Sequence, residues 1–367
     1  GLLAFSATES QAAAKKMSIK VGGYMQSNMG WASNDGSFES DTGSTARVHY
    51  DAFDIKQETE IYFTGTTKLD NGIAVSVTVQ LEGDQNHNGI QIDDSYMKMT
   101  GGFGDIRIGS TKFASAVLSH SSYGVGAVNI NTADENLWIV KPSAVSTGNS
   151  TTIGPNDDVK LVYITPKFNG FRLRASYIPS HVSISTAAPT TNTQPRIGGN
   201  NGTEAQQYDA VISYENKLGS VDLGVDAAYT VNRGTAAAST DMWRVGARLG
   251  FGAVGVALAY MDQDDTDTQS AGAVQNANAE TAWNFGVKYA SGPFQVGFDY
   301  LAADRPLTTA AQGSDKSAAM TLGGVYTMGP GVDLKGTILR VDHEDESTAT
   351  ANNNDGWAVI GAVKVSF

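Results

Sequence analysis

The sequence of 367 residues contains no cysteine and no long uninterrupted apolar run. The missing cysteine excludes disulfide bonds, thiolate metal sites and thiol nucleophiles. A membrane-spanning helix needs roughly 18 consecutive apolar residues, and the longest candidate, residues 249–261, is short and interrupted by glycines. These absences argue against a disulfide-stapled protein and against a helical membrane protein.

Positive charge is also scarce, because 25 Lys and Arg face 38 Asp and Glu and leave a formal charge of −13. A nucleic-acid partner is not expected, since binding phosphates requires a basic patch. The mean hydropathy of −0.22 is low for a membrane protein. A transmembrane β-barrel tolerates such a value because half of its wall faces water.

The pattern that is present is alternation of apolar and polar side chains. Such alternation predicts strands with one apolar and one polar face. At the carboxyl end, Trp357, Val359, Val363, Val365 and Phe367 share one parity, and Ala358, Ala362, Lys364 and Ser366 share the other. Residues 73–82 and 221–229 alternate in the same way. One face of each strand therefore suits lipid and the other suits water.

Strand starts and turns predict the architecture. In the second half, strands begin near Tyr208, Val221, Met242, Val254, Thr281, Phe294, Ala318, Val332 and Gly356, with short and long intervals in alternation. Seven short connections carry the glycine or Asn-Gly chemistry of tight hairpins, at residues 70–72, 101–104, 169–170, 218–220, 250–252, 291–293 and 329–331. Seven hairpins plus one strand at each terminus give about 16 strands.

These patterns predict an all-β fold, an antiparallel transmembrane β-barrel with short periplasmic turns and long extracellular loops. Aromatic residues near strand ends support two interfacial girdles, with Trp243 and Phe251, Trp283 and Tyr289, Phe294 and Tyr300, and Trp357 and Phe367 bracketing their strands. We expect a single barrel domain over residues 15–367. Residues 1–14, with an apolar start and an Ala-rich end, are expected to be a signal-peptide remnant or an N-terminal extension.

The chain resembles the general porins of Gram-negative outer membranes in three segments: residues 18–25 (SIKVGGYM), residues 102–109 (GFGDIRIG) and the terminal residues 365–367 (VSF). The resemblance implies a homotrimer of water-filled channels in the bacterial outer membrane, in contact with lipid and lipopolysaccharide. It also implies that the terminal aromatic residue, Phe367, is the signal read by the assembly machinery.

The longest connection, about residues 111–158, is the expected functional loop, because connections beyond about 15 residues are usually functional or disordered. In the porins that the chain resembles, the third loop folds into the lumen and narrows it, with acidic loop residues facing a basic wall. The resemblance therefore implies Asp134 and Glu135 as the acidic side. Apolar residues 116–118 and 137–139 are expected to anchor the loop.

Lumen parity gives the candidate basic side. In the family that the chain resembles, strands one to seven flank the inserted loop, so the resemblance implies that the wall residues at the constriction are Lys20, Lys56, Arg107, Arg172 and Arg174. The further basic residues expected in the lumen are Lys112, Arg244, Arg248 and Lys288. A cationic wall opposite acidic loop residues would create a transverse field that orients dipolar solutes. The sequence departs from many family members at Ser110, where they carry arginine.

No cofactor is expected. The acidic loop residues Asp262, Asp264, Asp265 and Asp267 could supply oxygen ligands to Ca²⁺ or Mg²⁺, although they lack the glycine and the spaced glutamate of an EF-hand.

The leading hypothesis is a porin for passive diffusion of small hydrophilic solutes and ions, with no enzymatic step. One alternative is a substrate-specific outer-membrane channel whose constriction binds a solute. A barrel enzyme that uses His120 or His343 and a soluble adhesive β-protein are the remaining alternatives.

Overall fold

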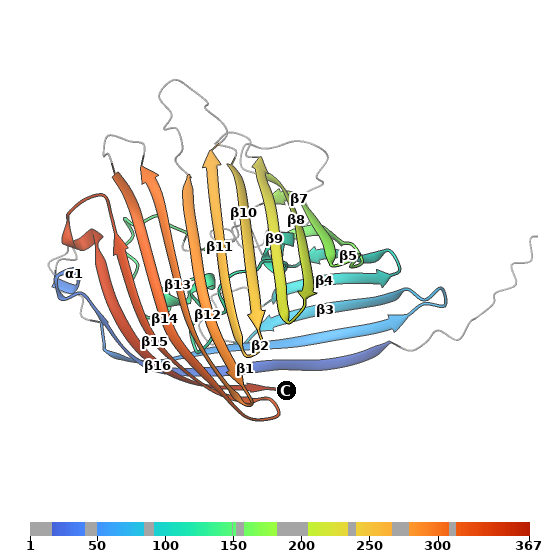
Figure 1. The fold of residues 1–367 in the computed structure, drawn as a ribbon, viewed down its shortest axis with the longest axis horizontal. Coiled ribbons are helices and arrows are strands. Elements are labelled where there is room, and N and C mark those ends of the chain that lie inside the picture. The colour runs from blue at the N-terminus through green and yellow to red at the C-terminus, as the bar shows by residue number, and fades with distance from the viewer. Residues whose placement is uncertain are drawn as a thin grey trace, which may run out of the picture.

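The computed structural model describes residues 17–40, 50–83, 92–148, 150–151, 158–181, 205–233, 240–265, 279–307 and 313–367. The predicted segment 1–14 lies outside these residues. Sixteen antiparallel strands form a closed barrel in which each strand pairs with its neighbours in the chain and β1 pairs with β16 (Figure 1). The predicted all-β barrel and its strand number are therefore confirmed.

The strands follow one another in the order of the chain. They are β1 (Ser18–Asn34), β2 (Phe53–Lys68), β3 (Ala74–Glu82), β4 (Ile92–Gly101), β5 (Gly104–Ser110), β6 (Val159–Ile164), β7 (Phe171–His181), β8 (Ala205–Leu218), β9 (Val221–Arg233), β10 (Thr240–Phe251), β11 (Val254–Asp265), β12 (Glu280–Ser291), β13 (Phe294–Leu307), β14 (Gly313–Gly329), β15 (Val332–Glu344) and β16 (Asn354–Ser366).

Helical segments are short. They are α1 (Gly36–Ser40), α2 (Ala114–Val117), η1 (Ile130–Thr132), η2 (Asp134–Leu137) and η3 (Thr350–Asn352). Within the described ranges, no helix combines the length and the apolar character needed to cross a membrane.

The seven predicted short connections all join neighbouring strands. The β6–β7 turn shows why Asn and Gly occur in these short connections. Asn169 and Gly170 have φ angles of 47° and 92°, a left-handed backbone that Asn and Gly adopt at the lowest cost. The barrel closes near the same rim, where Gly23 and Phe367 exchange two backbone hydrogen bonds of 3.0 Å.

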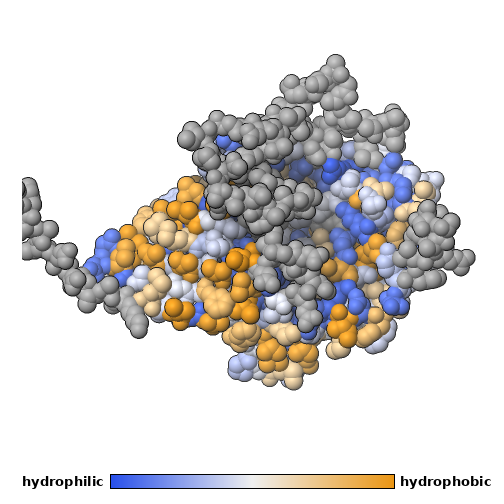
Figure 2. Space-filling view, turned by 180° about the vertical axis from the view of Figure 1, so that it is seen from behind, coloured by the Kyte–Doolittle hydropathy of each residue, from blue (hydrophilic) through white to orange (hydrophobic). Residues whose placement is uncertain are grey.

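The outer wall carries the apolar parity of the strands, and Figure 2 shows hydrophobic side chains spread over it. Leu258, Val359 and Val365 are 54%, 45% and 43% exposed, which suits contact with lipid rather than water. Aromatic rings pair across neighbouring strands, as Trp283 and Tyr300 do with ring centroids 5.0 Å apart.

The main buried apolar cluster lies inside the barrel rather than in its wall. Loop residues Val128, Ile130, Trp138 and Ile139 pack against Leu301, Ala319, Leu339, Val341, Ala358 and Ile360 on β13–β16. The inner parity of these four strands is locally apolar because a loop, not water, covers it. The predicted insertion of the third loop is therefore visible as the core of the molecule.

Candidate pore constriction

The connection between β5 and β6 runs along the inner face of the barrel, and its described part covers residues 111–148 and 150–151. A segment without strand pairing must find other acceptors for its buried backbone N–H groups. Carboxylates on the inner wall supply many of them.

The first half of the loop is held by Asp209 on β8 and Asp299 on β13. The Ser115 backbone N–H donates to Asp209 Oδ2 at 2.8 Å. The Asp299 carboxylate, which is 0% exposed, accepts from Tyr123 N at 2.7 Å and from Gly124 N at 3.0 Å. Bonds of N–H groups to an ionised acceptor are about twice as strong as neutral ones, so each carboxylate fixes one stretch of loop.

The second half of the loop is held in the same way. The Ser146 backbone N–H donates to Asp315 Oδ2 at 2.8 Å, and Gly148 N donates to both carboxylate oxygens of Glu280 at 2.8 Å. Neutral acceptors complete the set, since Ala127 N donates to Thr337 Oγ1 at 2.8 Å. The attachments run over β8, β12, β13, β14 and β15, and the start of the loop is also bonded to β6 and β7 through Lys160 and Ser176. Beyond Ala114, the described part of the loop makes no backbone hydrogen bond to β2–β7, which leaves that side of the loop free.

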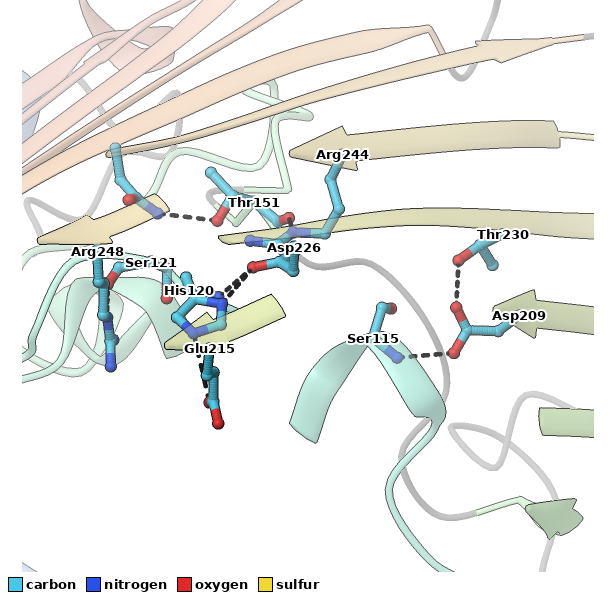
Figure 3. Close-up of polar contacts among 11 residues, drawn as sticks. Ser115, His120, Ser121, Thr151, Asp209, Glu215, Asp226, Thr230, Arg244 and Arg248 are labelled. Atoms are coloured by element: carbon cyan, nitrogen blue, oxygen red, sulfur yellow. Dashed lines mark hydrogen bonds and ion pairs between the residues drawn. The ribbon is translucent and has the colours of Figure 1, made fainter. Parts of the chain in front are cut away.

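A charged node surrounds Asp226 on β9 (Figure 3). The carboxylate accepts from the His120 backbone N–H, lies 2.9 Å from His120 Nδ1 and forms an ion pair with the Arg244 guanidinium. Arg244 Nε also donates to the Thr151 carbonyl oxygen at 3.0 Å. On its other side, His120 Nε2 lies 3.6 Å from Glu215. The predicted lumen residue Arg244 is fully buried in this node and does not line open water.

The loop can approach the wall this closely because glycine occupies the inner face of the strands beneath it. A Cβ atom added at any of these positions would meet loop atoms within 1.7–2.8 Å. The positions are Gly30, Gly224, Gly246, Gly255, Gly286, Gly297, Gly323 and Gly356. At Gly323 the added atom would lie 1.7 Å from the Val125 carbonyl oxygen, which no backbone contact accommodates. These glycines form a region of the inner wall against which the loop packs closely.

Of the predicted apolar anchors, Trp138 and Ile139 are buried at 8% and 0% exposure, whereas Leu137 is 61% exposed. Leu118 packs against the small cluster of Ala114, Val211 and Ala228, while Val117 is 44% exposed. The loop therefore has a buried face and a free face, as expected of an inserted segment.

The structure places the predicted acidic pair away from open water. Glu135 is fully buried within the loop, so its carboxylate does not line the lumen. Asp134 is partly buried and accepts from Asn129 N at 3.0 Å and Thr132 Oγ1 at 2.9 Å. Burial raises the pKa of Asp134, and these hydrogen bonds oppose the shift. Sequence spacing could not reveal that η2 turns Glu135 inward.

Three of the predicted basic residues come together. Arg107 on β5 lies close enough to repel Arg174 on β7, and Arg172 lies on the same face of β7. Arg174 is 0% exposed and donates to the Lys112 carbonyl oxygen at 3.1 Å. Among the described residues, buried nitrogen atoms of all three guanidinium groups have no hydrogen-bond partner: Nε of Arg107, Nε of Arg172, and Nε and Nη1 of Arg174. We refer to these residues as the arginine cluster.

The remaining basic candidates lie apart from this cluster. Lys20 is exposed on β1, and Lys56 on β2 pairs with Asp54 and lies 5.3 Å from the Trp138 ring. Arg248 and Lys288 lie 4.8 and 4.5 Å from the Tyr123 ring. Those two residues border a cavity of about 1050 Å³ at the rim of the short turns.

Sequence reasoning missed an acidic sector on β2–β4. Glu60 and Glu82 face each other in the β2–β3 register, and Asp93 has a carboxylate oxygen within 4.8 Å of theirs. Glu58 accepts from the Tyr24 hydroxyl at 2.5 Å. The inner parity of residues 58, 60 and 82 was the available signal. The lumen wall thus carries acid on β2–β4 beside the arginine cluster on β5 and β7.

The predicted cation ligands are not gathered in the described part of the chain. Asp262 and Asp264 follow the outer parity of β11, where Asp262 is opposite the exposed Trp243. Asp267 and the side chain of Asp265 lie outside the described residues. Among described residues, two other groups bring three carboxylates together, namely Glu60 with Glu82 and Asp93, and Asp315 with Asp345 and Glu346.

Known proteins match this architecture. Solved structures with the same fold include the anion-selective porin from Comamonas acidovorans, with 15% identity, 96% of this chain and 100% of that chain covered, and a TM-score of 0.62. The trimer form of OmpT from Vibrio cholerae is 8% identical, with 96% of this chain and 99% of that chain covered and a TM-score of 0.63. A mutant of Rh. blastica porin is 16% identical, with 95% of this chain and 100% of that chain covered and a TM-score of 0.59. No curated protein sequence matches the chain.

The sequence also matches the family described as Gram-negative porin over residues 1–346. That match spans most of the barrel, and the closed sixteen-strand fold with its inserted loop agrees with it. The chain belongs to the Gram-negative porin family, and it is a multi-pass outer-membrane β-barrel that forms a channel for passive diffusion.

Proposed function

We propose that solutes pass between the free face of the inserted loop and the wall formed by β2–β7. The observation that carries this proposal is the attachment of the other loop face to β8 and β12–β14 through Asp209, Glu280, Asp299 and Asp315. Bonded and packed surfaces leave no room for water. The route is therefore bordered by the acidic sector on one side and the arginine cluster on the other.

This arrangement favours small hydrophilic solutes and ions, in particular solutes with separated charges. The partly exposed guanidinium groups of Arg107 and Arg172 supply positive charge and hydrogen-bond donors to anionic groups. Glu58 and Glu60 attract cationic groups from the neighbouring sector. A transverse field of this kind orients a dipolar solute before it enters the narrow segment.

The test is the reversal potential of purified protein in a planar bilayer under a salt gradient. Arg107→Gln and Arg172→Gln each remove one lumen charge, and we expect the cation-to-anion permeability ratio to rise in both. Arg340→Gln is the matched control, because Arg340 is 50% exposed and pairs with Asp355 outside the lumen. A parent protein without ion conductance would refute the channel, and unchanged ratios in both lumen variants would refute the route.

A substrate-specific channel is the second candidate, and one observation favours it. Arg248 and Lys288 both lie near the Tyr123 ring beside the cavity at the turn rim, which resembles a site for an anionic or aromatic solute. Saturable conductance that a solute blocks, with the block lost in Tyr123→Leu, would support this function over general diffusion.

We further propose a homotrimer in contact with lipid and lipopolysaccharide, with Phe367 as the assembly signal and without a catalytic step. The trimer form of OmpT, a protein of the same fold, supports the oligomeric state. Three equal closing steps in single-channel records would be its signature. Deleting Phe367 should lower the assembled yield, and no hydrolytic activity dependent on His120 or His343 is expected.

A further inference from the structure

Three carboxylates meet at the rim of the long loops, away from the arginine cluster. Asp315 lies near the start of β14, and Asp345 and Glu346 follow the end of β15. One carboxylate oxygen from each residue lies within 4.8 Å of the other two. Asp315 is only 1% exposed, so the group is anchored by a buried charge and is not a purely solvated surface cluster.

A second, independent feature concerns the two oxygens of Asp315. Oδ2 accepts hydrogen bonds from the backbone N–H and the hydroxyl of Ser146. Oδ1 is buried and has no hydrogen-bond partner among the described residues. An ionised oxygen withdrawn from water without a partner carries a large desolvation cost. A buried carboxylate that has one unpartnered oxygen and is grouped with two further carboxylates indicates a missing positive ligand.

The surrounding groups strengthen the negative field. Asp345 Oδ2 is held by Ser347 N at 3.3 Å and by Asn352 Nδ2 at 2.7 Å, which fixes the orientation of that carboxylate. A cavity of about 470 Å³ beside Asp345 and Glu346 is also bordered by Asp35, Asp342, Glu344 and Asp355.

Two cationic groups also face this region and must be counted. Arg305 is opposite Asp315 in the β13–β14 register and donates to the Ser146 carbonyl oxygen at 3.0 Å. Lys141 donates to the Thr147 carbonyl oxygen and lies near enough to act on Asp315. Each is engaged by a backbone carbonyl, and Asp355 at the cavity is paired with Arg340. The remaining carboxylates of the cluster and its cavity outnumber these positive charges.

We propose that Asp315, Asp345 and Glu346 bind one divalent cation, with Ca²⁺ preferred over Mg²⁺. Ca²⁺ binds oxygen ligands at about 2.3–2.6 Å, so two ligand oxygens on opposite sides of the ion are up to about 5 Å apart. Mg²⁺ needs shorter and more regular bonds, near 2.0–2.1 Å. Water completes the coordination from the open side of the cavity.

The site has a mechanical consequence because Asp315 also holds Ser146. A cation there joins the returning limb of the inserted loop to the segment that follows β15. The bound ion therefore steadies the loop that borders the diffusion route, and its removal loosens one of the attachments.

The experiment measures calcium binding to full-length protein refolded without lipopolysaccharide, using isothermal titration in detergent. Asp315→Asn and Glu346→Gln should each weaken one binding event at least 10-fold, and excess Mg²⁺ should compete poorly. Asp264→Asn is the control, since it removes a carboxylate from the outer face of β11. Glu346→Gln tests the site even where Asp315→Asn disturbs the fold, which circular dichroism reports.

Calcium binding of unchanged affinity and stoichiometry in the Glu346→Gln variant would overturn the proposal. A titration without any binding to the parent protein would overturn it as well. Ion conductance of the parent in chelator is a separate measurement, so failure of the cation site is distinguishable from failure of the diffusion channel.

Discussion

Replacing Asp299 tests whether wall carboxylates hold the loop in the barrel. The carboxylate is 0% exposed and accepts from Tyr123 N at 2.7 Å, Gly124 N at 3.0 Å and Val125 N at 3.4 Å. Asp299→Asn keeps the size of the side chain but removes the charge and replaces one acceptor oxygen with a donor. Asp299→Ala removes both acceptors.

The magnitude follows from the two short bonds. A hydrogen bond to a charged group contributes about 1.5–3 kcal/mol net. Asp299→Asn should therefore weaken loop docking by about 2–3 kcal/mol, and Asp299→Ala by about 3–6 kcal/mol. Since each 1.4 kcal/mol is tenfold in population, the asparagine variant raises the fraction of undocked loop by about 30- to 150-fold.

Single-channel recording is the assay, with open-level noise and the frequency of brief closures as the readout. Asp222→Asn is the control, because Asp222 is 65% exposed and its pair with Lys217 at 3.2 Å contributes little. The barrel itself should keep its strand content by circular dichroism. Traces of both Asp299 variants that match the parent in noise and closures would refute the role of the carboxylate.

Three further changes test other parts of the structure. Gly323→Ala should displace the loop and change conductance, because its Cβ would lie 1.7 Å from Val125 O, whereas Gly324→Ala should not, since its nearest neighbour is 3.7 Å away. Leu258→Arg on the lipid face should lower the unfolding free energy in vesicles by about 2–4 kcal/mol, whereas Val254→Arg near the rim should lower it by about 0–1 kcal/mol. Equal losses in the two variants would contradict the membrane placement. Burial raises the pKa of Asp134 above its usual value, so the parent protein should gain stability as pH falls through that pKa. Asp134→Asn does not titrate and should remove this part of the pH dependence of the thermal midpoint between pH 7 and about pH 4.

The barrel could be predicted because each signal for it depends only on residues that are close together in the sequence. A residue such as Val359 needs only its parity to be assigned to lipid, and an Asn-Gly pair needs only its own φ angles to be assigned to a turn. Both signals are repeated along the chain, so errors at one strand do not propagate. Strand number and hairpin order followed from them.

The candidate site was less predictable because the burial and direction of its side chains depend on contacts between distant parts of the chain. Ile360 breaks the polar inner parity of β16, and its burial depends on packing with loop residues that are distant in the sequence, such as Trp138. Glu135 is acidic and lies in the loop, yet the direction of its side chain depends on how η2 meets the wall. Arg107, Arg172 and Arg174 were found from parity because they lie on regular strands.

Two inner-wall patterns in the amino-acid sequence mark the position of the loop. Mid-strand glycines such as Gly246 and Gly297 weaken a strand unless another backbone approaches closely, and the buried carboxylates Asp209 and Asp299 need donors that strand pairing does not provide. Both patterns face inward on neighbouring strands, and each compensates for the other. The glycines admit a loop backbone, and the carboxylates accept the N–H groups that this backbone withdraws from water. Part of the −13 charge of the chain is thus committed to positioning the loop, so the ion preference of the channel depends on the arginine cluster and the acidic sector and cannot be read from the net charge.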